Sequence, residues 1–428
     1  MLKEIEPISW KKIACFFVLF FAITMLLTAC AEEPLLEAVS ITPSIISPNA
    51  DGQEDLANIT FKLNRNADVG IYFYDAMGRQ YTFRKSVPLS LNEEPYSVLF
   101  PGVVDGFLLP GEEYPFSVLK RTLPDGEYTW EIVANPKEEG ERMTVSGSLT
   151  VQNADTQLPG ITGFSVYPKT FSPNQDGLDD RVRINAFLQK DVEDLQLYML
   201  DNDGVRHHIA EDPQSTTPPN EYGLHTFDYD GGIDAGAEPP PDGTYTVYAE
   251  ARDLVGQRTL ISDTLTLVDA GRPMAYILNA EVEWSVESTL TLGETLRFTL
   301  TVENDSTTPI RTSGPFPSTV YDSDENYATL NQTIEAGVFR VGIHCENSTI
   351  NYPWRWAIGD PETLIQDEEG HYYLPPFERA TVTGGIRFID VIEARNPQYC
   401  WAGLIHEDVE IAALNNNVDP IFLQIIAP

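Results

Sequence analysis

One nine-residue motif occurs twice in this chain, 125 residues apart, and it is rich in turn-forming and oxygen-bearing residues. The copies read Ser-Pro-Asn-Ala-Asp-Gly-Gln-Glu-Asp at 47–55 and Ser-Pro-Asn-Gln-Asp-Gly-Leu-Asp-Asp at 172–180. An alternating apolar run follows each copy and ends at Leu63 or Leu188. Such alternation is typical of a half-buried strand, because successive strand side chains point to opposite faces. The repeat therefore predicts two similar domains in which an oxygen-rich turn leads into a strand.

The repeat extends beyond this motif. An Asp-x-x-Gly turn at 75–78 returns at 201–204, and Pro-Asp-Gly-x-Tyr-Thr occurs at 124–129 and at 241–246. Short apolar runs separated by Pro, Gly, Asn and Asp are the pattern of an antiparallel β-sandwich. A repeat of this length indicates duplicated domains rather than a solenoid. The predicted fold class is all-β, with three tandem immunoglobulin-like β-sandwich domains.

These landmarks, in this order, resemble those of the immunoglobulin-like domain of the flagellar hook-capping protein. The resemblance covers residues 40–268 and implies the immunoglobulin-like fold. It does not imply a flagellar role, because such modules serve many proteins as spacers and adhesive units.

Two short linkers, at 152–160 and 269–273, separate the domains, and both contain Pro, Gly and Asp. The third region lacks the motif, but Leu296, Phe298 and Leu300 alternate with polar residues as in a strand. The predicted organisation is a signal peptide at 1–29, a lipidated cysteine and tether at 30–43, immunoglobulin-like domains at 44–152 and 161–268, and a C-terminal β-sandwich at 274–428.

The N-terminus resembles a bacterial lipoprotein signal. A basic stretch precedes an apolar run at 13–29, which ends Leu-Thr-Ala before Cys30. The resemblance implies cleavage before Cys30 and a diacylglycerol on its sulfur, and two or more acyl chains anchor a protein firmly. The alternative is an uncleaved membrane helix, for which the run is slightly short. The resemblance implies a lipid anchor on the extracytoplasmic face of the cell envelope. If the cell has two membranes, Ala31 rather than Asp after the cysteine favours the outer one.

The chain is strongly acidic, with a formal net charge of −38. A chain of this charge repels nucleic acid, so no nucleic-acid partner is expected. Solubility of an exposed protein accounts for the charge, and capture of divalent cations is the alternative.

Two cysteines remain after Cys15 leaves with the signal peptide and Cys30 is lipidated. They are Cys345 and Cys400. In an exported, oxidising setting we predict a disulfide between them. Closing a loop of about 55 residues would stabilise the fold by roughly 4 kcal/mol in the chain-entropy model. The alternative is a pair of buried free thiols.

The segment Tyr-Pro-Trp-Arg-Trp at 352–356 is the most distinctive in the third region. It resembles a Trp-Arg-Trp segment of the bacterial intracellular proteinase inhibitor family, which is a β-sandwich. Strand periodicity places Trp354 and Trp356 on one side. Core or edge packing is the favoured interpretation, and a sugar-stacking ligand site is the alternative.

The repeated motif also presents side-chain oxygens at matching positions in its two copies. Calcium takes six to eight oxygen ligands, and a glycine in each copy permits the sharp turn that would converge them. The alternative is that Asn and Asp bond to the turn backbone. The candidate structural calcium ligands are Asn49, Asp51, Asp55, Asn174, Asp176 and Asp180.

The sequence contains no pattern typical of a catalytic site, such as Gly-x-Ser-x-Gly or a phosphate-binding loop. We therefore expect a membrane-anchored extracellular lipoprotein, not an enzyme, that acts in adhesion or as a scaffold or spacer. Recognition of an extracellular protein or glycan is expected in the C-terminal domain, which lies farthest along the chain from the anchor. The alternative is an enzyme or protease regulator whose C-terminal domain acts on a polysaccharide or protease.

Overall fold

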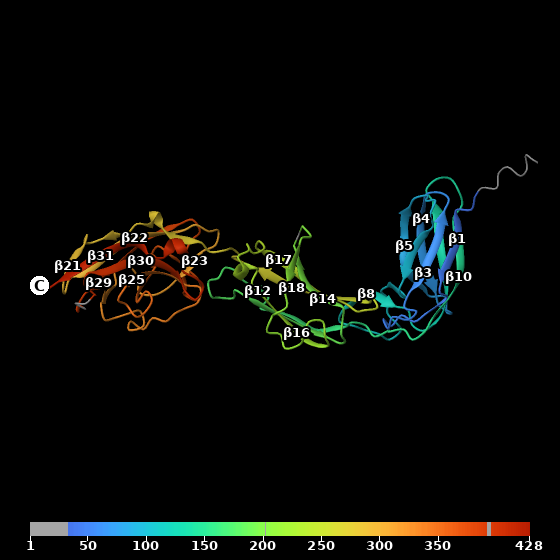
Figure 1. Ribbon diagram of the computed structural model, residues 1–428, viewed down its shortest axis with the longest axis horizontal. Coiled ribbons are helices and arrows are strands. Elements are labelled where there is room, and N and C mark those ends of the chain that lie inside the picture. Colours follow the sequence, from blue (N-terminus) through green and yellow to red (C-terminus); the bar gives the residue numbers. More distant parts are fainter. Residues whose placement is uncertain (1–32, 202, 392–394) are drawn as a thin grey trace, which may run out of the picture. The chain divides into compact units, whose positions relative to one another are not determined.

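The computed structural model describes residues 33–201, 203–391 and 395–428, which form strands, loops and short 3-10 helices (Figure 1). The all-β prediction is confirmed. No helix within these ranges has the length and apolar character needed to span a bilayer. The predicted signal peptide and Cys30 lie outside the described residues.

The chain divides into two compact units. The first comprises the described residues up to Tyr114 together with Val118–Pro159 and Arg252–Thr259, and the second comprises Pro115–Ser117, Gly160–Ala251 and Leu260–Pro428.

The first unit contains a sandwich of two sheets, with strand orders β1-β3-β6 and β2-β10-β9-β4-β5. Inward-facing residues of β3 and β4, such as Phe61 and Phe73, are fully buried, as the alternation predicts. Phe73 stacks on Phe100 of the opposite sheet, with 4.3 Å between ring centroids. The strands of these sheets are β1 Leu36–Thr42, β2 Ile45–Ile46, β3 Ala57–Leu63, β4 Ala67–Tyr74, β5 Gln80–Leu89, β6 Tyr96–Phe100, β9 Gly126–Pro136 and β10 Met143–Val151. Outside these two sheets, β7 Val103–Asp105 pairs with β8 Ser117–Thr122.

Strand β1 lies within the segment expected to be a tether, so the first domain begins earlier than predicted. The register of β1 against β3 shifts between Glu37 and Ser40, and Ala38 has a positive φ of 50°. A bulge of this kind inserts an extra residue and interrupts period-two alternation. The pattern that would have revealed the strand is therefore absent from the sequence.

The second unit begins with a domain that repeats the first arrangement. The sheet β11-β13-β16 corresponds to β1-β3-β6, and β12 pairs in parallel with β18 as β2 does with β10. The elements are β11 Ile161–Tyr167, β12 Thr170–Phe171, β13 Val182–Leu188, β14 Asp194–Leu200, β15 Arg206–Ile209, β16 Gly223–Tyr229, η1 Ile233–Ala235, β17 Gly243–Arg252 and β18 Arg258–Leu267.

The C-terminal domain, in the same unit, is a sandwich of different topology. One sheet has the order β19-β22-β29-β24, and the other has the order β21-β31-β30-β25-β23-β28-β27. β20 pairs with β22, and β26 pairs with β25. The elements are β19 Ala275–Ile277, η2 Leu278–Ala280, β20 Glu283–Trp284, β21 Thr289–Thr291, β22 Thr295–Asn304, β23 Ile310–Thr312, β24 Val320–Asp322, β25 Phe339–Cys345, β26 Trp354–Ala357, β27 Ile365–Gln366, β28 Tyr372–Leu374, β29 Arg379–Arg387, β30 Gln398–His406, η4 Ala413–Asn415 and β31 Val418–Ile426.

Candidate functional site

The first repeated loop is closed by its own Asn and Asp side chains. Asp55 accepts hydrogen bonds from three backbone N–H groups, those of Asn49 at 3.2 Å, Ala50 at 2.8 Å and Gly52 at 2.7 Å. Asn49 Oδ1 accepts from the N–H of Asp51 at 3.0 Å. The three predicted residues do come together here, and their contacts are those of an Asx-type turn.

The second loop is closed in a similar way, although one of the three donors differs. Asp180 accepts from the backbone N–H groups of Asn174 at 3.3 Å, Asp176 at 3.2 Å and Gly177 at 2.7 Å. Asn174 Oδ1 accepts from the N–H of Asp176 at 3.0 Å. All six predicted residues thus lie in two equivalent clusters. Their oxygens already bond to the backbone, which is the alternative to calcium binding, and calcium binding stays a prediction.

The two loops share a backbone conformation but differ in burial. The equivalent glycines, Gly52 and Gly177, have φ values of 86° and 85°. The space around Gly52 is open, whereas a Cβ on Gly177 would lie 1.9 Å from the carbonyl oxygen of Ala336 in the C-terminal domain. The second loop therefore needs glycine for close approach as well as for its turn.

The second loop packs against the C-terminal domain through hydrogen bonds to its backbone carbonyls. Arg311 Nη1 donates to the carbonyl oxygen of Asp176 at 3.0 Å. His406 Nε2 lies 2.8 Å from the carbonyl oxygen of Gln175. A carbonyl only accepts, so this ring nitrogen carries a proton. We call this contact the joint.

Burial at the joint shifts the pKa values of two side chains in opposite directions. The Asp176 carboxyl is buried, and loss of hydration raises its pKa to about 6. The same cause lowers the pKa of His406 to about 4, so its ring is neutral at physiological pH.

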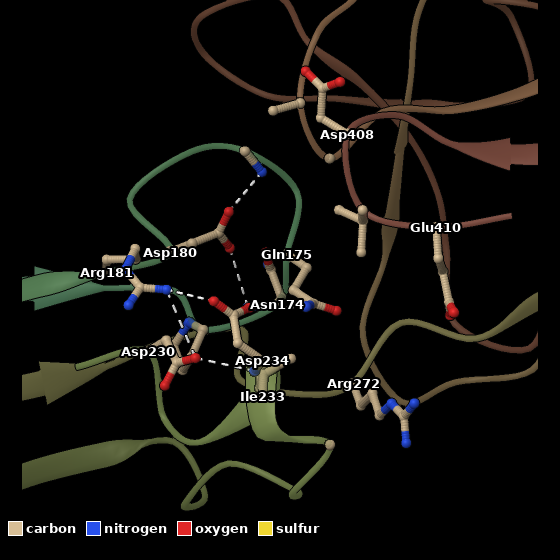
Figure 2. Close-up of a pocket in the computed structure, with 16 residues that line it drawn as sticks. Asn174, Gln175, Asp180, Arg181, Asp230, Ile233, Asp234, Arg272, Asp408 and Glu410 are labelled. Atoms are coloured by element: carbon tan, nitrogen blue, oxygen red, sulfur yellow. Dashed lines mark hydrogen bonds and ion pairs between the residues drawn. The ribbon is translucent and has the colours of Figure 1, made fainter. Parts of the chain in front are cut away.

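A polar cavity of about 500 Å³ lies beside the joint (Figure 2). Arg181 occupies one side and pairs with Asp234 at 2.6 Å and Asp230 at 3.7 Å. Asp408 and Glu410 of the C-terminal domain are among the residues that line the cavity (Figure 2). Arg181 offsets the acidic charge of the second domain here, and the cavity forms part of the joint.

The predicted disulfide is confirmed. Cys345 of β25 and Cys400 of β30 are directly opposite in the ladder, and their sulfurs are bonded. The bond fastens the two central strands of the larger C-terminal sheet.

The structure contradicts the interpretation of Trp354 and Trp356 as a sugar-stacking pair. They are only 4% and 0% exposed and belong to the domain core, where Trp356 packs edge-on against Phe298 at 4.7 Å. Both indole N–H groups donate to backbone carbonyls. The packing alternative describes both residues, although Trp354 is among the residues that line a neighbouring pocket.

Aromatic side chains instead line the outward face of that larger sheet. Trp401 packs against His344 with 4.8 Å between centroids, Tyr399 lies 5.6 Å from Trp401, and Phe422 lies 5.0 Å from Tyr399. We call these four residues, on β25, β30 and β31, the aromatic row. Phe422 is 61% exposed and the other three are half-buried. Their neighbours Ile343, Cys400 and Leu423 point into the core.

The sequence contained a signal for the aromatic row. Tyr399 and Trp401 flank Cys400 in a period-two pattern, so a buried cysteine would turn both rings outward. That inference requires the disulfide cysteine to face the core, as Cys400 does in the structure.

Neither the family models nor the curated proteins searched match this chain. Among solved structures, similarity extends to a 1.5-MDa bacterial ice-binding adhesin, at 11% identity over 84% of this chain and 100% of that chain, with a TM-score of 0.18. A DUF4785 family protein from Legionella pneumophila matches at 9% identity over 90% of this chain and 84% of that chain, with a TM-score of 0.22. Cadherin domains 3–6 of protocadherin gamma B2 match at 10% identity over 82% of this chain and 100% of that chain, with a TM-score of 0.16. Scores at this level carry no argument about function, and the fold assignment rests on the strand topology.

Proposed function

We propose that this chain is a lipid-anchored extracellular protein that acts in adhesion or as a scaffold or spacer. Its C-terminal domain recognises a partner on a neighbouring surface, and its role is binding rather than catalysis. The resemblance of the N-terminus to a lipoprotein signal supports the anchor at Cys30. The disulfide between Cys345 and Cys400 supports export, because disulfides persist in oxidising compartments.

The observation that carries the recognition role is the aromatic row. Aromatic rings with polar edges are enriched where proteins bind their partners, since they combine a large apolar area with few rotatable bonds. The row lies on a central part of the sheet, where β30 pairs with β25 on one side and β31 on the other. The disulfide beneath it ties β25 to β30. A surface held in this way is preorganised, which reduces the entropy lost on binding.

The test is a binding assay with the purified, fluorescently labelled full chain on intact cells and on extracellular matrix. Unlabelled wild type and Phe377→Ala should displace the labelled chain, whereas Phe422→Ala should not. Phe377 is a matched control, because it is an exposed phenylalanine of the same domain outside the row, 63% exposed against 61% for Phe422. Equal displacement by all three proteins would show that the row is not the recognition surface.

A further inference from the structure

We infer that a pocket at one end of the C-terminal sandwich binds a short alkyl diamine, the chemistry of free polyamines and of neighbouring lysine side chains in a peptide. This site is separate from the aromatic row and goes beyond the proposed recognition function. The inference follows from the place of the pocket in the fold, from a buried amide that lines it and from the carboxylates around it.

The pocket has a volume of about 280 Å³ and lies where loops from both sheets meet. The segments after β24 and β29, in one sheet, line it together with the loop after β25 and the start of β30, in the other. The N–H of Ile389 donates to Ser323 Oγ at 3.2 Å and joins the first two segments. Trp354 and Phe388, which belong to the core, also line the pocket. It therefore reaches from the surface to the core between the sheets.

Gln398 gives the pocket a buried polar group without a protein partner. This first residue of β30 is only 3% exposed, and its side chain lies on the core side of the strand, opposite to that of Tyr399. Its amide forms no hydrogen bond with another described residue. The described polar atoms that are fully enclosed without a partner do not include this amide, so it is accessible from the pocket that it lines. Because a buried amide without a partner is costly, its position indicates a ligand that can form hydrogen bonds.

The charge of the pocket favours a cation. Three carboxylates line it, those of Asp324, Glu325 and Asp390, and no lysine or arginine is among the described residues that line it. Arg387, at the end of β29, is bonded to Asp322 instead, with two N–O distances of 2.7 Å. The pocket carboxylates are therefore without a basic partner among the described residues, in a chain whose net charge is −38. Such a concentration of negative charge attracts positively charged ligands.

These carboxylates are too far apart to share one metal ion. Calcium holds its oxygen ligands at about 2.3–2.6 Å, so the ligand atoms of a metal site lie close together. Within the described ranges, the group of three acidic or histidine side chains with ligand atoms within 4.8 Å of one another is Asp367, Glu369 and His371. That group lies in the turn between β27 and β28 and does not line the pocket. The pocket charge is thus suited to a cation larger than a metal ion.

An alkyl diamine matches both the charge and the depth of the pocket. Each ammonium group carries three N–H donors and no acceptor, so it pairs with carboxylates and with an amide oxygen. One ammonium group donates to Gln398 Oε1 at the inner end, and the other pairs with Asp324 and Asp390, which are exposed at the rim. The methylenes between them pack against Trp354 and Phe388, where their burial is favourable.

The experiment is isothermal titration calorimetry of the purified full chain with putrescine, with n-butylamine and with calcium chloride. Putrescine should bind wild type saturably, and the monoamine at least about tenfold more weakly, because it lacks the second charged contact. Asp324→Asn with Asp390→Asn should weaken putrescine binding by a similar factor, and so should Gln398→Leu. The matched control is Asp305→Asn with Asp360→Asn, which changes two exposed aspartates of the same domain outside the pocket and alters the net charge equally.

Unchanged thermal midpoints would establish that the variants fold, and the aspartate pair alone decides the test if Gln398→Leu does not fold. A lack of saturable putrescine binding to wild type, or equal binding by the pocket pair and the control pair, would overturn the inference. Calcium binding that the pocket pair abolishes, without putrescine binding, would make this a metal site and overturn it as well. A blocked dilysine peptide separates the two sources of the diamine. Tighter binding of the peptide than of putrescine would assign the pocket to lysines of a partner, and weaker binding would assign it to a free polyamine.

Discussion

At the scale of single residues, the joint holds two groups whose protonation affects stability in opposite directions. Asp176 has a pKa of about 6 in the folded state, above the value near 4 of an exposed aspartate. Its contribution to the free energy of unfolding is therefore present at low pH and lost as pH rises through 6. His406 has a folded pKa of about 4, below its ordinary 6.5, so its contribution is present above pH 6.5 and lost as pH falls towards 4. Between pH 4 and 6.5 the two effects oppose each other.

Removing one of the two groups should leave only the other group's effect on how stability varies with pH. In Asp176→Asn, stability should fall relative to wild type as pH drops from 6.5 to 4, by up to about 3 kcal/mol, at about 1.4 kcal/mol for each pKa unit. In His406→Gln, stability should instead rise relative to wild type over the same range. Urea denaturation in chelator at several pH values measures both. Variants that run parallel to wild type would show that neither group titrates across this window.

Local chemistry could be predicted from the sequence, and long-range burial could not. Asn174, Asp176 and Asp180 converge because they lie within seven residues on one tight turn, which their spacing already indicated. The packing of this loop on Ala336 and Arg311 depends on residues far along the chain. The equivalent first loop is exposed, so the motif alone does not specify whether a copy is buried.

At the scale of elements, calcium binding by the two repeated loops stays a prediction. Binding to the native state would raise stability by mass action, about 2.7 kcal/mol at a hundredfold excess over the dissociation constant. Millimolar calcium should therefore raise the thermal midpoint of wild type more than that of Asp51→Asn with Asp176→Asn, relative to chelator. Equal shifts, or none, would leave both loops as hydrogen-bonded turns.

Period-two patterns identified strands well but did not decide which face is buried. Trp354 and Trp356 share a side, as predicted, and that side is the core. Tyr399 and Trp401 also share a side, and that side is the surface. The register of β30 between β25 and β31 decides the difference, and sequence periodicity does not contain that pairing. Strand β1 could not be predicted at all, because its bulge interrupts the period-two alternation.

At the scale of the whole molecule, the proposed function requires a lipid anchor at Cys30 and a recognition surface on the same chain. Substituting Cys30 with serine should block lipidation and signal cleavage and so prevent normal display of the protein. Substituting Phe422 should leave display intact and remove recognition. The two variants therefore separate attachment from binding.

The most direct measurement is retention of living cells on a surface coated with extracellular matrix that binds the labelled full chain. Cells that express wild type or Phe377→Ala should be retained, and cells that express Cys30→Ser or Phe422→Ala should not, with Phe422→Ala present at the surface in wild-type amounts. Retention of cells that express the correctly displayed Phe422→Ala variant at the wild-type level would contradict the central claim that the C-terminal aromatic row is the recognition surface.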